Sequence, residues 1–128
     1  MPEIPKLTKQ IGTGIDIESV GRLRFKTMAS SPFLSRTFTR RERAYCMSKA
    51  NPPVHFAGTF AAKEAAFKAV QAIHRGQLGV TDFEVSRRRN GVPVVKYTGG
   101  DNALRKIGIK VSVSHTAEYA VAVALAFL

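Results

Sequence analysis

The sequence predicts an α+β fold in which helices pack on one mainly antiparallel sheet. Two observations lead to this prediction: a strong helix-forming segment at residues 59–70, and alternating apolar patterns, typical of strands, before and after it. The predicted order is one strand, three helices, two strands, a short helix and two strands, which belongs to the α+β class. A chain of 128 residues is the size of one domain. We expect residues 11–128 to form that domain and residues 1–10 to be a flexible arm.

The composition is that of a folded protein and limits the sites it can hold. Hydrophobic residues make up 45% of the chain, which is typical of a globular domain. The single cysteine, Cys46, excludes an internal disulfide and a multi-cysteine zinc site. No apolar run approaches the roughly 20 residues that span a bilayer, and the first residues lack the hydrophobic core of a signal peptide. We therefore expect a cytoplasmic protein with no membrane partner.

The charge predicts an anionic partner. Twenty Lys and Arg residues against nine Asp and Glu residues give a formal net charge of +11. Such a field attracts anions and raises their encounter rate. Nucleic acid, an anionic membrane, an acidic protein and a phosphorylated small molecule all fit, and the charge alone does not choose among them.

The first predicted strand, residues 11–17, carries a carboxylate on its less apolar face. Isoleucines occupy one face, while Asp16 shares the other with Gly12 and Gly14, which leave room for a close neighbour. A buried carboxylate needs a cation, a hydrogen-bond donor or water. Asp16 is therefore either a functional residue or a strand-end residue bonded to backbone amides.

Two helices, with one helical turn between them, precede the central helix. The first, residues 18–29, has Ser19 as its predicted cap and carries Arg22 and Arg24, which form either a solvated basic face or a docking surface for an acidic partner. A helical turn is predicted at residues 33–36. A capping box at residues 39–42 then opens a helix that runs to about residue 49.

The central helix, residues 59–70, places Glu64 and Lys68 four residues apart on one face. Proline residues before the segment and a glycine after it mark its ends. Two interpretations of the pair are open. It is a surface ion pair, or it holds a divalent cation and the phosphate beside it, with small alanines giving a ligand access.

The second half of the chain is predicted to be mainly strands. An Asn-Gly turn joins strands at residues 82–86 and 92–97, with three consecutive arginines at the tip of this hairpin. A short helix at residues 102–106 precedes strands at residues 107–115 and 119–128. The last strand is apolar on both faces, so its alanine face is expected under a helix and its Val, Leu and Phe face against other subunits.

Residues 111–115 end a strand, where side chains can meet a ligand. Alternation places Ser112 and Ser114 on one face and His115 on the other. His115 either donates to a phosphate or shuttles a proton, or it is a satisfied polar residue at a strand end.

Four of these segments together resemble the holo-acyl-carrier-protein synthase family, the small phosphopantetheinyl transferases. They are residues 14–17 (GIDI), residues 39–42 (TRRE), residues 60–65 (FAAKEA) with Lys68, and residues 111–115 (VSVSH). Arg22 also falls where family members often carry an arginine. Each motif alone is weak, but four in the same order over residues 11–128 are specific.

The resemblance implies an enzyme with the phosphopantetheinyl transferase fold that moves the 4′-phosphopantetheine arm of coenzyme A to a serine of an acyl carrier protein, releasing adenosine 3′,5′-bisphosphate. It implies that Asp16 and Glu64 hold Mg²⁺ against the diphosphate and that Lys68 contacts its phosphates. It also implies that either Glu64 or a metal-bound water beside it takes the serine proton. Ser114 and His115 would lie near the nucleotide of coenzyme A.

The resemblance also implies partners. Arg22 and Arg24 would bind the acidic acyl carrier protein, and three chains would form a homotrimer with active sites between subunits. The rival interpretations are a non-catalytic relative that binds coenzyme A or a carrier protein, and a basic nucleic-acid-binding module built on the arginine-rich hairpin. We expect no nucleic-acid partner, because the chain has no tryptophan and no aromatic-rich sheet motif that stacks bases.

Two positions depart from the family pattern. Family members often have an arginine where this chain has Thr59, which removes one phosphate donor. A glycine-threonine-glycine turn commonly follows the central helix, whereas residues 70–76 here have another sequence. His74 and Arg75 are the candidates to replace the missing contacts.

Overall fold

The computed structural model of the protein describes residues 10–27 and 30–128. The predicted arm, residues 1–10, therefore lies outside the described residues except for Gln10, and so does Ala29 at the predicted end of the first helix. No helix within the described ranges is long and apolar enough to cross a membrane.

The elements follow the predicted order. The strands are β1 (Ile11–Ser19), β2 (Phe83–Arg87), β3 (Pro93–Tyr97), β4 (Gly108–His115) and β5 (Tyr119–Phe127). The helices are α1 (Val20–Lys26), α2 (Pro32–Thr37), α3 (Arg40–Met47) and α4 (Pro52–Gln71), with short 3₁₀ turns η1 (Val80–Asp82) and η2 (Asn102–Leu104). The largest shift is at α4, which begins at Pro52, seven residues before the predicted segment. The first helix begins at Val20, and not at residue 18, because β1 continues to Ser19, the residue that caps the helix as predicted.

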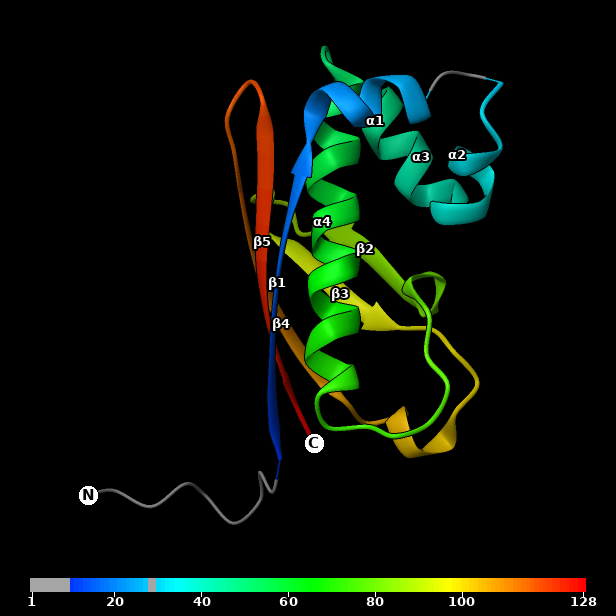
Figure 1. Cartoon of the computed structure of the whole chain (residues 1–128), viewed down its shortest axis with the longest axis vertical. Helices are drawn as coiled ribbons and strands as arrows, with labels where there is room; N and C mark the ends of the chain where they lie inside the picture. Colours follow the sequence, from blue (N-terminus) through cyan, green and yellow to red (C-terminus); the bar gives the residue numbers. More distant parts are fainter. Residues whose placement is uncertain (1–9, 28–29) are drawn as a thin grey trace, which may run out of the picture.

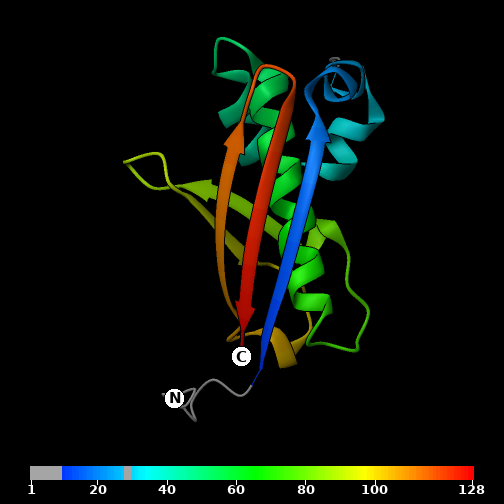
Figure 2. The same cartoon turned by 60° about the vertical axis from the view of Figure 1, so that its left-hand side comes forward.

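The strands are antiparallel, as predicted, but they form two sheets instead of one. The larger sheet has the order β1-β5-β4, and the smaller one is the β2–β3 hairpin. Figure 2 shows the three long strands side by side with α4 behind them. The prediction of a single sheet was wrong because periodicity identifies strands without identifying their partners. The hairpin uses its buried Val85 and Val95 to pack in the core beside α4, and it does not extend the larger sheet.

Helix α4 lies along β1 and β5 and organises the domain (Figure 1). A Cβ atom at Gly12 would overlap the carbonyl oxygen of Ala69, and one at Gly14 would overlap that of Ala65. Only glycine therefore lets β1 pass this close to the helix backbone. The predicted close neighbour of the two glycines is α4.

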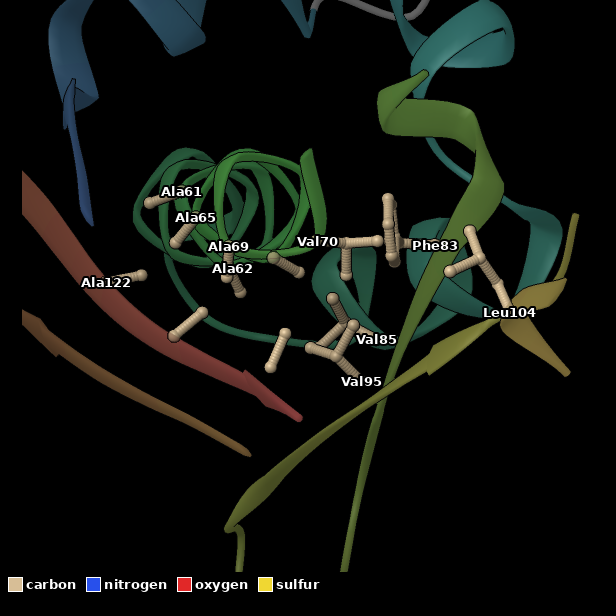
Figure 3. Close-up of a cluster of buried hydrophobic side chains, with 13 residues drawn as sticks. Ala61, Ala62, Ala65, Ala69, Val70, Phe83, Val85, Val95, Leu104 and Ala122 are labelled. Carbon is tan, nitrogen blue, oxygen red and sulfur yellow. The ribbon is translucent and has the colours of Figure 1, made fainter. Parts of the chain in front are cut away.

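The main core is built from small side chains on α4 and β5 and larger ones on the hairpin. Figure 3 shows alanines of α4 facing Ala122 of β5, with Val70 of α4 facing Phe83 of β2. The small alanine side chains let the helix and the sheet lie close together, while Phe83 and Leu104 fill the wider space under the hairpin. A second core cluster lies under α1, α2 and α3, around Leu23, Phe38 and Phe56.

One buried ion pair ties three elements together. Glu42 of α3 and Lys63 of α4 are fully buried, and the Lys63 Nζ donates to Glu42 Oε1 at 2.8 Å. The same oxygen accepts from the Thr39 amide, which completes the predicted capping box, and Glu42 Oε2 accepts from the Val85 amide at 2.7 Å. Every oxygen of this carboxylate has a donor, so the pair fixes α4 against α3 and β2.

The outer face of the larger sheet is apolar and open in the single chain. The alanines of β5 face α4 and are buried, as predicted. The isoleucine face of β1 points away from α4, so Ile15 and Ile17 are each 63% exposed, and their neighbour Val123 on β5 is 50% exposed. Alternation identified the two faces of β1, but the glycine face is the one that α4 covers.

Candidate active site

Asp16 and Lys68 meet where β1 crosses α4. The Lys68 Nζ donates to Asp16 Oδ1 at 3.3 Å and to the backbone carbonyl of Ile15 at 3.0 Å. The Asp16 side chain is only 12% exposed, whereas Lys68 is about half exposed. Lys68 thus pairs across to the strand and not with Glu64 on its own helix, so the interpretation of Glu64 and Lys68 as a simple surface ion pair was wrong.

The glycine spacing of β1 explains why Asp16 lies here. Residues 12, 14 and 16 share one face of the strand, and Gly14 packs on Ala65 and Lys68 of α4. The next residue on that face, Asp16, must then lie one step further along the helix surface. β1 therefore places the carboxylate of Asp16 at the face of α4 that carries Glu64 and Lys68.

A third carboxylate, Glu18, belongs to this group and was not predicted from the sequence. Burial, a hydrogen bond with Asp16, and the charges of Asp16 and Glu64 raise the pKa of Glu18 to about 8, while Arg22 acts in the opposite direction. The sequence did contain a sign of it, since Asp16 and Glu18 are two residues apart and so share a strand face. It was missed because residue 18 was assigned to the start of a helix.

Asp16 is close enough to Glu18 and Glu64 to raise the pKa of each. Burial and then the charge of Asp16 raise the pKa of Glu64, although Lys68 lowers it. Asp16 Oδ2 is buried and has no hydrogen-bond partner among the described residues. A buried acceptor without a donor costs free energy, and the carboxylates of Asp16 and Glu64 with the one ammonium of Lys68 leave an excess of negative charge. Both observations fit a site for a cation.

The donor set suits a hard cation such as Mg²⁺. All the available ligand atoms are carboxylate oxygens, which Mg²⁺ prefers, and Mg²⁺ usually takes its remaining ligands from water and phosphate. Within residues 10–27 and 30–128, no group of three or more His, Cys, Asp and Glu side chains forms a complete metal site. A cation bound by Asp16 and Glu64 would therefore need further oxygen ligands from water or a substrate.

His115 and Ser114 lie apart from the carboxylates in the single chain. His115 is on the inner face of β4, with its ring centroid 6.4 Å from that of His55 in α4. The register pairs His115 with Ala120 and Ala120 with Glu18, so β5 separates His115 from Glu18 by two strand spacings, about 10 Å. Ser114 is exposed on the opposite, outer face. The two residues are therefore not brought together with Asp16 and Glu64 by one chain.

Arg22 and Arg24 are exposed on α1, directly after the carboxylate strand. Arg22 is near enough to Glu18 to affect its pKa, so the basic face of α1 adjoins the carboxylate site. A partner bound to α1 would reach that site.

The positions that depart from the family pattern have structural roles. Thr59 is buried, with its hydroxyl 3.6 Å from the Sγ of Cys46, so it faces the core. His74 lies beyond the C-terminal end of α4, where its Nε2 is 2.9 Å from a carboxylate oxygen of Asp101. The proposal that His74 or Arg75 replaces the missing contacts remains a prediction.

Comparisons with known proteins identify the family of the chain. Residues 12–124 match the model of the 4′-phosphopantetheinyl transferase superfamily. The chain is 43% identical over 117 residues to a holo-[acyl-carrier-protein] synthase of Koribacter versatilis, covering 88% of this chain and 94% of that protein.

Solved structures of similar proteins have the same fold. The acyl carrier protein synthase of Mycobacterium tuberculosis matches with a TM-score of 0.73 and 31% identity, over 91% of this chain and 97% of that one. The Helicobacter pylori holo-[acyl-carrier-protein] synthase in complex with coenzyme A matches with a TM-score of 0.72 and 30% identity, over 88% of this chain and 96% of that one. The chain belongs to the 4′-phosphopantetheinyl transferase superfamily.

Proposed function

We propose that the protein transfers the 4′-phosphopantetheine arm of coenzyme A to a serine of an acyl carrier protein, with Mg²⁺ as cofactor. The observation that carries the proposal is the carboxylate site, in which the buried Asp16 Oδ2 has no partner and Lys68 stands beside it. The similar proteins support the substrates, because the Koribacter versatilis relative is a holo-[acyl-carrier-protein] synthase and the Helicobacter pylori structure contains coenzyme A.

The residues of the site have distinct roles in this reaction. Asp16 and Glu64, with Glu18 beside them, would hold the Mg²⁺, which when bound neutralises negative charge on the diphosphate. Lys68 binds the phosphate oxygens, since its ammonium is half exposed and held at the site by Ile15 and Asp16.

The proton of the carrier serine goes to Glu64. As the serine Oγ forms its bond to the phosphorus that carries pantetheine, the bond from that phosphorus to the bridging oxygen breaks, and adenosine 3′,5′-bisphosphate leaves. Glu64 is a partly buried carboxylate beside Asp16 and Lys68, so it lies where it could accept this proton.

The carrier and the assembly complete the proposal. The carrier would dock on Arg22 and Arg24, whose charges suit an acidic protein. Three chains would pack through the open apolar face of the larger sheet, as a homotrimer. That assembly would place Ser114 and His115 of one chain beside the carboxylates of the next, since one chain keeps them apart.

The test is the mass of an apo acyl carrier protein after incubation with coenzyme A, Mg²⁺ and the protein. The expected result is a gain of one phosphopantetheine group, which is lost when a chelator is added and when the carrier serine is replaced by alanine. A carrier of unchanged mass would instead favour a non-catalytic relative that binds coenzyme A or carrier.

A further inference from the structure

The middle of α4 is held in the core by one long, fully buried side chain. Within residues 57–69, all of which the structure describes, the buried residues other than Lys63 are alanine, glycine and threonine. Phe60 and Phe67 are only partly buried. Small side chains let α4 lie close to β1 and β5, but they form few ridges that fix how the helix is turned about its axis. Lys63 is therefore the main anchor of this part of α4.

The contact that Lys63 makes depends on direction. The Lys63 Nζ lies 2.8 Å from Glu42 Oε1, and neither side chain has any exposed surface. Glu42 is also held by the backbone amides of Thr39, at 2.8 Å, and Val85, at 2.7 Å. Because Thr39 caps α3 and Val85 lies in β2, the Glu42 carboxylate is fixed independently of α4. A hydrogen bond weakens steeply when its geometry changes, so the pair holds α4 at one rotation.

The rotation that pairs Lys63 with Glu42 also orients Glu64. Successive residues of an α-helix are turned by about 100° and rise by about 1.5 Å, so neighbouring side chains cannot be reoriented independently. With Lys63 in the core, Glu64 points toward β1, where it is close enough to Asp16 to be affected by its charge. Lys68 also ties α4 to β1, but its side chain is 48% exposed, and an ion pair in contact with water is a weaker restraint.

A purely stabilising role does not explain why the core pair is charged. Taking two charges out of water is costly, and a buried ion pair that is replaced as a whole by uncharged groups of similar shape often leaves a protein no less stable. What uncharged groups supply less well is strict geometry. Mg²⁺ demands nearly ideal octahedral geometry, so a carboxylate ligand that is turned out of place binds it less tightly.

We infer that Glu42 and Lys63 are positioning residues for the cation site, and that together they hold Glu64 in the orientation in which it binds Mg²⁺ with Asp16. The inference rests on the proposed function for the identity of the cation. Glu42 and Lys63 lie in the core and act through Glu64, without contact with the cation or the substrates.

An uncharged version of the pair, Glu42→Gln combined with Lys63→Met, tests the inference. Both substitutions keep the approximate shape of the side chains, the glutamine keeps an acceptor for the Val85 amide, and no charge is left unpaired, so the double variant should fold. Electron paramagnetic resonance of free Mn²⁺, which prefers the same oxygen ligands, measures cation binding without the transfer reaction. The double variant should bind Mn²⁺ about tenfold more weakly than the wild type, as is typical when a residue that orients a metal ligand is lost.

The transfer reaction gives a second measurement. In the carrier mass assay the double variant should need about tenfold more Mg²⁺ for half of its maximal rate, while the KM for the carrier protein stays as in the wild type. Glu42→Asp, which keeps the charge but shortens the side chain, should weaken Mn²⁺ binding in the same direction by a smaller factor. If the double variant does not fold, the Mn²⁺ affinity of Glu42→Asp decides the test.

Leu104→Ala is the matched control for a loss of stability. Leu104 is fully buried in the main core, and none of the hydrogen bonds of Glu42 involves it. Its replacement by alanine leaves a cavity and should lower the unfolding temperature. The affinity for Mn²⁺ should stay as in the wild type, because Glu64 keeps its orientation.

The outcomes separate this inference from the proposed function. Wild-type Mn²⁺ affinity in the double variant and in Glu42→Asp overturns the inference, even if the wild-type protein transfers phosphopantetheine. An equal loss of Mn²⁺ affinity in Leu104→Ala also overturns it, since the pair would then act only through stability. A wild-type protein that binds Mn²⁺ more tightly than the double variant but transfers nothing contradicts the proposed function alone. A wild-type protein that does not bind Mn²⁺ contradicts both.

Discussion

Lys63 and Glu64 are neighbours on α4, yet their surroundings differ completely. Lys63 faces the core, where Glu42 is its partner and every oxygen of that partner has a donor. Glu64 faces β1, where burial and then the charge of Asp16 raise its pKa. The paired charge of Lys63 stabilises the fold, whereas the carboxylates around Glu64, which lack enough partners, mark a site for a ligand. The larger sheet shows the same contrast, with a closed alanine face and an open face of isoleucine, valine and leucine.

The largest effect on stability is expected from breaking the buried ion pair between Lys63 and Glu42. Lys63→Met leaves the carboxylate of Glu42 buried without its cation, and such a loss costs about 3–5 kcal/mol. Urea denaturation measures the free energy of unfolding. The matched control is Lys68→Met, whose ammonium is half exposed and which should cost much less. Equal losses in the two variants would show that the core pair has no special role.

A charge on the open face of the sheet should break the assembly. Val123→Asp would place an unpaired carboxylate in the proposed subunit interface, raising the dissociation constant of the trimer by roughly a hundredfold. Light scattering at micromolar concentration should then show monomers, and transfer should be lost although Asp16 and Glu64 are unchanged. Arg88→Asp, with an exposed side chain on the β2–β3 hairpin away from this face, controls for the change of charge. A wild-type protein that is a monomer with full activity would rule out the trimer.

The sequence predicted local structure well because its causes are local. The capping box at residues 39–42 and the Ser19 cap depend on residues three positions apart, and both are confirmed. The ion pair of Glu42 with Lys63 joins residues 21 positions apart, and no periodic pattern in the sequence predicts it. The division of the strands into two sheets is non-local for the same reason.

The site was predicted in part, again for a physical reason. Motif spacing brought Asp16, Glu64 and Lys68 into one hypothesis, and the structure places them together where β1 crosses α4. Glu18 escaped notice because its role depends on β1 continuing two residues further than predicted.

The raised pKa of Glu18 should make the free energy of unfolding depend on pH. Burial and the nearby carboxylates raise the pKa of Glu18 from its ordinary value of 4.5 to about 8 in the folded protein, so the folded state binds more protons between these values. Stability is therefore greatest below about pH 4.5 with respect to this group and falls as the pH rises through about 8. Thermal unfolding at pH 6 and pH 8 should show this fall, and Glu18→Gln should reduce it. A fall of the same size in Glu18→Gln would assign the effect to another group.

The smallest effect is expected at the surface of α1. Arg22→Glu should weaken binding of an acidic carrier protein by roughly three- to tenfold, because an exposed charge pair contributes little and is screened by salt. Affinity for coenzyme A should not change. Surface plasmon resonance at two salt concentrations measures both effects, with Arg88→Glu as the control of equal charge. Equal carrier affinities for the two variants would show that the basic face of α1 is solvated and does not bind the carrier.

The most direct test of the account compares Glu64→Gln with the wild-type protein in two measurements on the same samples. Glu64→Gln removes one negative charge from the carboxylate group, so without Mg²⁺ the variant should unfold at a temperature no lower than the wild type does. In the carrier mass assay with coenzyme A and Mg²⁺, it should transfer no measurable phosphopantetheine. A variant that transfers at the wild-type rate would contradict the assignment of this site, and one that unfolds several degrees lower would show that Glu64 belongs to the fold.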